Sequence, residues 1–217
     1  MKNKLVKVMN MRLFCVSIFA LLALAAPAGA LDHDLSMQVL AEINLARTKP
    51  HAYAGFLREF RSQFRGKYYV LPGSSTRVQT SEGVAAVDEA VRFLSRLKPL
   101  PPLSWSDGLA EAAAELADEQ GRSGATGHNG RKSHGMRERI ERHGEWEGQI
   151  GENIGYGPEG ARNMVMQLII DDGVPGRGHR VNTFSREYKT AGVACGLHPR
   201  FGTLSVIDFA GGFRDGR

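Results

Sequence analysis

The amino-acid sequence predicts an α+β fold. Apolar residues recur at helical spacing through most of the chain between residues 34 and 171. The two runs that alternate like strands, 191–197 and 203–209, come after these helices. A doubly wound sheet would require helices and strands to alternate along the chain, and this sequence does not show that order. We therefore expect separate helical and sheet layers within one domain.

The first 30 residues have the three parts of a secretory signal peptide. A basic start with Lys2, Lys4, Lys7 and Arg12 is followed by the apolar run Leu13–Ala26 and the small residues Ala28–Ala30. The run is shorter than the roughly 20 residues that span a bilayer. We expect a secreted or periplasmic protein, with one domain over residues 31–217.

Removal of this leader changes what the net charge implies. The leader holds four of the 28 Lys and Arg residues and none of the 23 Asp and Glu residues, so the mature chain is nearly neutral. A basic protein would suggest a nucleic-acid partner, and that argument loses its main support. We expect neither a nucleic-acid partner nor a membrane span in the mature chain. Cys15 leaves with the leader, so Cys195, in an apolar run, is expected to be an inert buried thiol without a disulfide.

Two consecutive helices are predicted at the start of the mature chain. The first begins at a cap, either Asp34 or Ser36, and continues to Thr48. Pro50 interrupts it, and proline suits the first position of the helix that follows.

A third helix follows a segment rich in turn residues. Residues 66–80 mix tyrosines with Pro, Gly and Ser, which indicates a loop or one short strand. Ser81 is the expected cap of the third helix, and Pro99 stops it. Three prolines within residues 98–102 then predict an extended linker.

The next helix is expected at 107–120, capped by Ser106 and ended by Gly121. Residues 121–130 form a glycine-rich loop. A short helix at 136–143 has alternating charges from Arg137 to Arg142, which indicates a solvated face.

The last helix is expected at 160–171, and the Pro/Gly segment 173–178 breaks it. The two terminal strands form a hairpin. The second of them contains Asp208 among apolar residues, and a buried carboxylate there would need a partner that the sequence does not identify.

Three polar side chains have glycine beside them and lie where elements meet loops. His128 lies in Thr-Gly-His-Asn-Gly, Glu152 in Gly-Glu-Asn-Ile-Gly, and His179 in Gly-His-Arg-Val-Asn. Such settings can present a side chain to a cleft. Each also has an ordinary structural explanation, namely a loop histidine bonded to a backbone carbonyl or a capping or surface carboxylate.

Together with the stretch Val-Leu-Ala-Glu-Ile-Asn-Leu-Ala-Arg at 39–47, these three motifs resemble the CAP superfamily of cysteine-rich secretory proteins, antigen 5 and plant pathogenesis-related class-one proteins. The resemblance runs from about residue 36 to 213 and is greatest to the disulfide-free bacterial branch. It implies a three-layer α-β-α sandwich with a central antiparallel sheet. It also implies a cleft in which two histidines and two acidic residues often bind a divalent metal.

Carried over motif by motif, His128, Glu152 and His179 match three of the four cleft positions. The fourth is a glutamate on the helix before the second histidine, where this chain offers Asp171 and Asp172, and we assign Asp172. Two imidazoles and a carboxylate suit zinc, with one coordination position open for water or a ligand. The residues expected to contact a ligand are His134, Asn153 and Arg180, although a solvated loop position also explains His134.

The resemblance favours a non-enzymatic exported protein whose cleft holds a divalent metal and a small, lipid-like or envelope-derived ligand. A second hypothesis is a metal-dependent hydrolase of peptides or cell-wall material, with Glu152 as general base. A third is an interaction module in which these side chains only hold loops together. The sequence determines neither a catalytic residue nor the oligomeric state.

Overall fold

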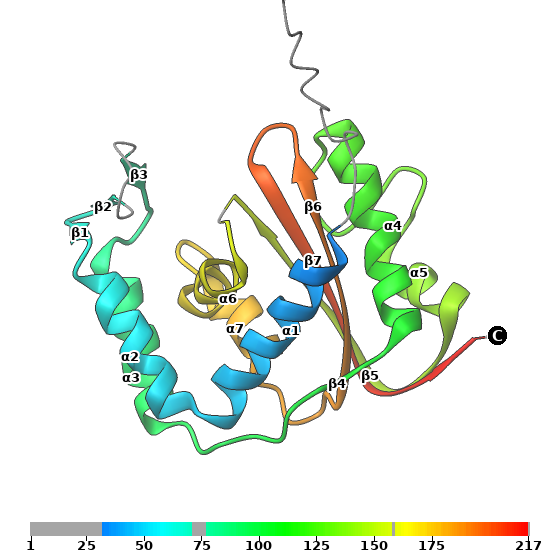
Figure 1. The fold of residues 1–217 in the computed structure, drawn as a ribbon, viewed down its shortest axis with the longest axis horizontal. Helices are drawn as coiled ribbons and strands as arrows, with labels where there is room; N and C mark the ends of the chain where they lie inside the picture. Colours follow the sequence, from blue (N-terminus) through cyan, green and yellow to red (C-terminus); the bar gives the residue numbers. More distant parts are fainter. Residues whose placement is uncertain (1–31, 71–76, 158, 217) are drawn as a thin grey trace, which may run out of the picture.

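A four-stranded sheet forms the centre of the computed structural model, in the order β4-β6-β7-β5 (Figure 1). The structure describes residues 32–70, 77–157 and 159–216, so the expected leader lies outside the described residues. The strands are β1 (Phe64–Arg65), β2 (Tyr68–Tyr69), β3 (Val78–Gln79), β4 (Ser104–Trp105), β5 (Gly144–Tyr156), β6 (Thr190–His198) and β7 (Gly202–Asp215). The helices are α1 (His33–Thr48), α2 (Pro50–Arg61), α3 (Val84–Arg96), α4 (Asp107–Ser123), α5 (Met136–His143), α6 (Ala161–Ile170), the 3-10 turn η1 (Pro175–Arg177) and α7 (Gly178–Thr183).

Helices cover both faces of this sheet. Helices α4 and α5 pack on one face, and α1 and α6 pack on the other (Figure 1). Strands β5, β6 and β7 pair antiparallel, and the short β4 is parallel to β6. The expected α+β class and its three-layer sandwich are therefore confirmed.

The alternation of side chains along β7 explains the two apolar layers. Leu204 and Val206 pack against α4, whereas Ile207 and Phe209 join the larger core on the other face. Gly192 of β6 lets α4 approach closely, because a Cβ atom there would lie 2.0 Å from the backbone nitrogen of Ala110. The sheet is therefore buried on both faces.

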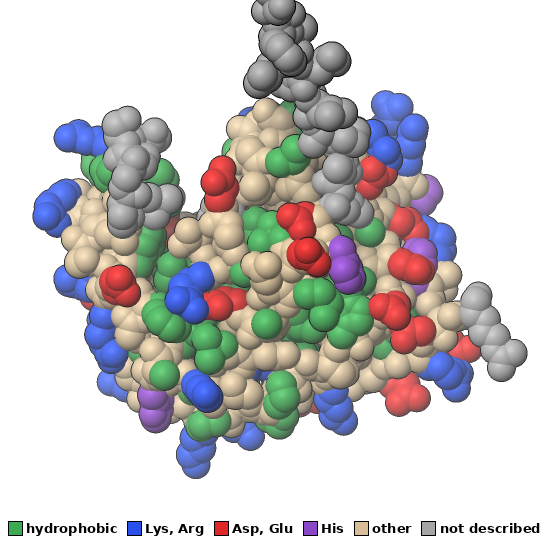
Figure 2. Space-filling model, viewed as in Figure 1, with side chains coloured by type: hydrophobic (Ala, Val, Ile, Leu, Met, Phe, Trp, Pro, Cys, Tyr) green, Lys and Arg blue, Asp and Glu red, His purple; other side chains and the backbone are tan. Residues whose placement is uncertain are grey.

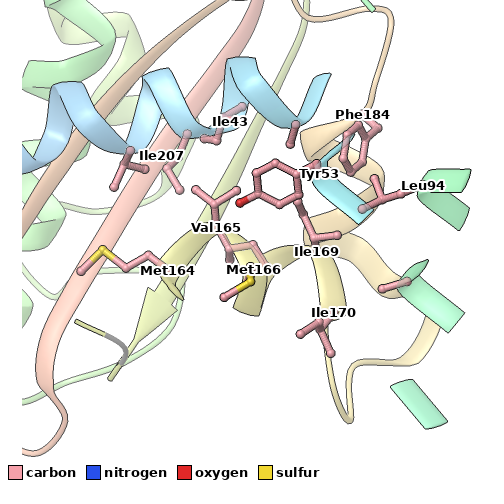
Figure 3. Packing of buried hydrophobic residues seen from close by; sticks show 14 of the residues in the cluster. Ile43, Tyr53, Leu94, Met164, Val165, Met166, Ile169, Ile170, Phe184 and Ile207 are labelled. Atoms are coloured by element: carbon pink, nitrogen blue, oxygen red, sulfur yellow. The ribbon is translucent and has the colours of Figure 1, made fainter. Parts of the chain in front are cut away.

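A helical arm extends from the main body and consists of α2, α3 and β1–β3 (Figure 1). Its inner side joins the main core, where Tyr53 of α2 lies beside Val165 and Ile169 of α6 (Figure 3). The described part of residues 66–80 contains two short strands, β2 and β3, where a loop or one strand was expected. The turn residues 71–76 of that expectation lie outside the described residues.

Several helix boundaries differ from the expected ones. Helix α1 is capped by Asp32, whose carboxylate accepts the amide of Leu35 at 2.9 Å, so both expected caps are wrong. Helix α3 has Gly83 rather than Ser81 at its cap. Ser106 caps α4 as expected, but that helix ends at the left-handed Gly124. Gly121 is buried within α4 and continues the helix.

The largest difference from expectation is β5, a strand that the sequence pattern does not predict. Its first half is mostly exposed and includes Glu145, and its register to β7 shifts between Glu147 and Ile150, beside Gly148 at φ +75°. Such a bulge disrupts the two-residue periodicity. Its second half, from Gly151 onward, is buried and carries Glu152.

On the face that Figure 2 shows, Lys and Arg side chains lie mainly along the left and lower edges, whereas Asp and Glu side chains lie mainly over the centre and right. Within the described ranges, no helix is long and apolar enough to cross a membrane.

Candidate functional site

A cavity of about 250 Å³ lies beside β5, which is the last strand at its end of the sheet. His128, from the loop after α4, and His179, from α7, both line it. Its remaining walls are Gly127, Ile154, Tyr156, Gln167, Leu168, Asp172 and Val174. The structure thus brings the two histidines, which are 51 positions apart in the chain, to one solvent-reachable hollow.

The carboxylate of Glu152 fixes the imidazole of His128. Its Oε1 atom lies 2.7 Å from Nδ1 of His128, and its side chain is only 1% exposed. The other oxygen, Oε2, accepts a hydrogen bond from the fully buried Arg139 of α5. Both carboxylate oxygens are therefore engaged, and Glu152 acts on the cavity through His128.

Arg139 also fixes the loop that carries His128. Its Nη1 atom donates to the backbone oxygens of His128 at 3.2 Å and of His134 at 2.8 Å. The expectation of a solvated face for this helix is wrong at Arg139. The spacing of α5 places Arg139 on the same helix face as the apolar Met136 and Ile140. These two apolar residues were the signal in the sequence that Arg139 would be buried.

The carboxylate of Glu152 raises the pKa of His128 above its ordinary value, chiefly through their hydrogen bond and against the opposing effect of partial burial. We therefore expect the His128 imidazole to titrate above pH 6.5 in an NMR titration. Because the pKa of His128 is raised in the folded state, its hydrogen-bonded pair with Glu152 stabilises the fold. This stabilisation is complete below pH 6.5 and disappears as the pH rises through the folded pKa.

Glu152→Gln should lower the pKa of His128, because the amide keeps the shape of the side chain and loses its charge. Glu145→Gln is the matched control, since Glu145 lies on the same strand but pairs with Arg214 at the surface. An unchanged His128 titration in Glu152→Gln would mean that this carboxylate does not govern the imidazole.

Asp171 holds the second histidine in the same way. Its Oδ1 atom lies 2.6 Å from Nδ1 of His179, and its Oδ2 atom accepts the backbone amides of His179 at 2.9 Å and Arg180 at 3.3 Å. Asp171 ends α6 in the left-handed conformation, with φ +56°. This turn directs its buried carboxylate back to the start of α7.

Asp172, which we expected at the fourth cleft position, lies in the cavity wall but is not hydrogen-bonded to His179. Its carboxylate accepts the amides of Ser81 at 2.6 Å and Glu82 at 2.8 Å, just before α3. The two adjacent aspartates diverge because the left-handed turn lies between them. The structure therefore assigns the place beside His179 to Asp171.

The three residues that we expected to contact a ligand are not among those that line the cavity. Asn153 is fully buried and donates to the His179 backbone oxygen at 3.0 Å. Arg180 is buried and donates to the backbone oxygens at the end of α6 and to Glu89. His134 is exposed and bridges to Gly130 through the backbone, outside the cavity lining. Asn153 and Arg180 are thus part of the framework behind His179.

Asp208 lies directly opposite Glu152 in the β5–β7 register. It is fully buried, and neither carboxylate oxygen has a hydrogen-bond partner within the described part of the chain. Burial raises the pKa of Asp208 well above its ordinary value, and the nearby charge of Glu152 raises it further. The neighbour that the sequence could not identify is therefore another acid, which favours a protonated Asp208.

The donor set of the cavity consists of two imidazoles. Among the described residues, the Nε2 atoms of His128 and His179 have no hydrogen-bond partner, while each Nδ1 atom is held by a carboxylate. A carboxylate on the other ring nitrogen is the usual support of a metal-binding histidine. In the same part of the chain, no group of three or more His, Cys, Asp or Glu residues is arranged around one metal position. Two imidazoles are donors that suit a divalent cation, which would take its other ligands from water or a bound molecule.

Comparison with known protein families identifies one that matches most of this chain. A family model described as CAP, cysteine-rich secretory protein family, matches residues 40–209. A search of curated proteins finds no match.

Three solved structures have low sequence identity to this chain. An extracellular protein with an SCP domain from Bacillus anthracis matches at 16% identity and a TM-score of 0.42, over 58% of this chain and 37% of its own. An outer surface protein from Borrelia burgdorferi matches at 18% identity and a TM-score of 0.43, over 51% and 78%. A cysteine-rich secretory protein from Staphylococcus aureus matches at 16% identity and a TM-score of 0.38, over 65% and 45%. The chain thus spans less than half of the first and third of these proteins.

Proposed function

The chain belongs to the cysteine-rich secretory protein (CAP) family, and we propose that it is an exported member whose cleft binds a divalent cation together with a small ligand. His128 and His179 would hold the cation, and zinc is the preferred metal because it favours imidazole nitrogen. A cation bound there would supply a positive charge that attracts an oxygen atom of the ligand.

One observation supports this proposal above the others. Two histidines line one cavity, and a buried carboxylate fixes each of them through Nδ1. Fixing one ring nitrogen selects the tautomer whose other nitrogen has a free lone pair, as a metal ligand requires. Two histidines that only held loops together would not need to line the same cavity with both Nδ1 atoms fixed by buried carboxylates.

The cavity wall indicates the chemistry of the ligand. Ile154, Leu168 and Val174 provide apolar surface beside the imidazoles. The volume of about 250 Å³ is below that of ordinary drug-sized sites, so the cleft suits a small molecule or one end of a longer one. A lipid-like or envelope-derived molecule with a terminal oxygen donor meets both requirements.

Binding is favoured over hydrolysis by the contacts of Glu152. The alternative of a metal-dependent hydrolase needs this carboxylate as general base towards a water molecule. His128 and Arg139 occupy its two oxygens, and little of the side chain reaches solvent. The buried position of Glu152 argues for support of the imidazole instead.

Zinc added to chelator-treated protein is expected to raise the melting temperature in a saturable way. At a concentration 100 times the Kd, the linkage relation gives about 2.7 kcal/mol, or roughly 5 to 10 °C for a domain of this size. His128→Ala and His179→Ala should each abolish most of the shift. Differential scanning calorimetry with zinc, magnesium and calcium in turn measures it. A medium-chain carboxylate added with zinc should raise the melting temperature further.

His143→Ala is the matched control for this experiment. His143 also pairs with carboxylates, Glu111 at 2.8 Å and Glu115 at 2.6 Å, but both of its ring nitrogens are engaged, and it does not line the cavity. If none of the three metals shifts melting at millimolar concentration, or if His143→Ala removes the shift as completely as the cleft variants do, the proposed cation site is wrong.

A further inference from the structure

The segment that carries His179 is attached to the helical arm by a dense set of contacts. It runs from Asp171, at the end of α6, through η1 to α7. Asp172 accepts two amides that precede α3, and the amide of Gly173 donates to Oε1 of Glu82 at 2.7 Å. The residues before α3 therefore donate backbone amides to a carboxylate of this segment, and the segment donates a backbone amide to a carboxylate before α3.

Two glutamates, Glu82 just before α3 and Glu89 within α3, form ion pairs with two arginines of this segment. The guanidinium of Arg177 donates to both oxygens of Glu82, at 2.6 and 2.7 Å, and through Nη2 to Glu89 at 2.6 Å. Arg180 donates to the other oxygen of Glu89 at 2.7 Å. His179 lies between these two arginines in the chain.

The arginine side chains are largely removed from solvent. Arg177 is 16% exposed and Arg180 is 4% exposed, whereas the side chains of Glu82 and Glu89 are 38% and 41% exposed, so these contacts form a half-buried network rather than isolated surface ion pairs. The pKa of the Glu82 carboxyl is lowered to about 2, chiefly by its hydrogen bond with Arg177. Forked contacts between guanidinium and carboxylate fix orientation as well as distance.

The backbone of the segment needs such support. Asp171 and Arg177 both have positive φ, at +56° and +54°, although neither is glycine. Residues other than glycine keep this conformation only where the surroundings impose it. Arg177 is also hydrogen-bonded to the Asp171 backbone oxygen at 2.7 Å, so the two left-handed residues are tied to each other and to the arm.

We infer that Glu82 and Glu89 are positioning residues for His179, and that the arm fixes the second imidazole of the cleft through Arg177 and Arg180. The relevance to ligand binding rests on the proposed function, whereas the positioning itself does not. The arm contributes no imidazole to the cavity, and its effect passes through the segment between Asp171 and Arg180.

The double variant Glu82→Gln/Glu89→Gln tests this inference, because it removes both charges and keeps the side-chain volumes. Backbone amide exchange over residues 173–180 should accelerate roughly tenfold or more. The ¹⁵N signals of the His179 ring should change from one tautomer, protonated at Nδ1, towards a mixture. Zinc affinity, measured by calorimetry, should fall about 10- to 100-fold, as with other residues that orient a metal ligand.

Asp88→Asn is the matched control, since Asp88 lies on the same helix but pairs with Arg61 within the arm. It should leave all three measurements within about twofold of the wild type. Arg177→Lys keeps the charge and loses the fork, and it should reproduce the accelerated exchange.

Unchanged exchange in the double variant would overturn the inference. Faster exchange with an unchanged His179 tautomer would also overturn it, because the contacts would then be merely structural. If wild-type protein binds no zinc, the proposed function fails, while the exchange and ring signals, which need no metal, still test the positioning.

Discussion

Arg139→Met is expected to lower the free energy of unfolding by about 3 to 5 kcal/mol. Arg139 is fully buried, and it supplies the positive charge beside the Glu152 carboxylate. Methionine fills much of the space but leaves the buried Glu152 carboxylate with the His128 imidazole in place of a guanidinium, and it frees two backbone oxygens of the 128–134 loop. The cost arises mainly from the uncompensated carboxylate rather than from the lost volume.

Urea denaturation at pH 7 measures this effect, and Arg142→Met provides the control. Arg142 lies on the same helix and also pairs with a glutamate, Glu115, but it is 40% exposed. Its replacement should cost less than about 1 kcal/mol. The double variant Arg139→Met/Glu152→Gln should recover part of the loss, because it removes the unpaired charge. A loss below about 1 kcal/mol for Arg139→Met would show that the buried pair does not stabilise this domain.

Asp208→Asn is expected to raise the free energy of unfolding by about 1 to 3 kcal/mol at pH 8, with little effect near pH 4. Asp208 has no hydrogen-bond partner among the described residues and lies beside Glu152, its direct neighbour on strand β5. Because the pKa of Asp208 is raised in the folded state, its protonated carboxyl contributes fully to the wild-type stability below the unfolded-state pKa of 3.8. That contribution is lost as the pH rises through the folded pKa. Asparagine has nearly the same shape and no proton to lose, so this loss should disappear.

Unfolding measured from pH 4 to pH 9 tests this expectation. Asp34→Asn, at an exposed position in the first turn of α1, makes the same chemical change and should leave the slope of stability with pH almost unaltered. If Asp208→Asn destabilises the protein at every pH, then Asp208 is ionised in the folded state and acts as a second partner of Arg139.

These two predictions concern the support of the cleft rather than its lining. Arg139, Glu152 and Asp208 lie beneath His128, between small apolar clusters on the α4 and α5 side of the sheet. One buried cation beside one carboxylate and one protonated acid leaves no net charge in this layer. Glu152 can then hold His128 without the cost of an isolated buried charge.

The amino-acid sequence by itself determined much of the helical framework. Local signals suffice for a helix, because its hydrogen bonds and its apolar stripe lie within a few residues of one another. Pro50 therefore placed the start of α2, Ser106 placed the cap of α4, and residues 136–143 were predicted with the observed bounds of α5. The motifs around His128, Glu152 and His179 identified the family, and two of their residues, His128 and His179, line the cavity.

Only the tertiary structure decided how these residues are paired. Asp171 rather than Asp172 holds His179 because a left-handed turn separates two adjacent carboxylates. Arg139 is buried because the face of α5 that carries it packs against β5. Strand β5 itself depends on pairing with β7, nearly 60 residues further along the chain. Such contacts depend on the directions in which side chains leave distant elements, and spacing along the sequence does not encode those directions.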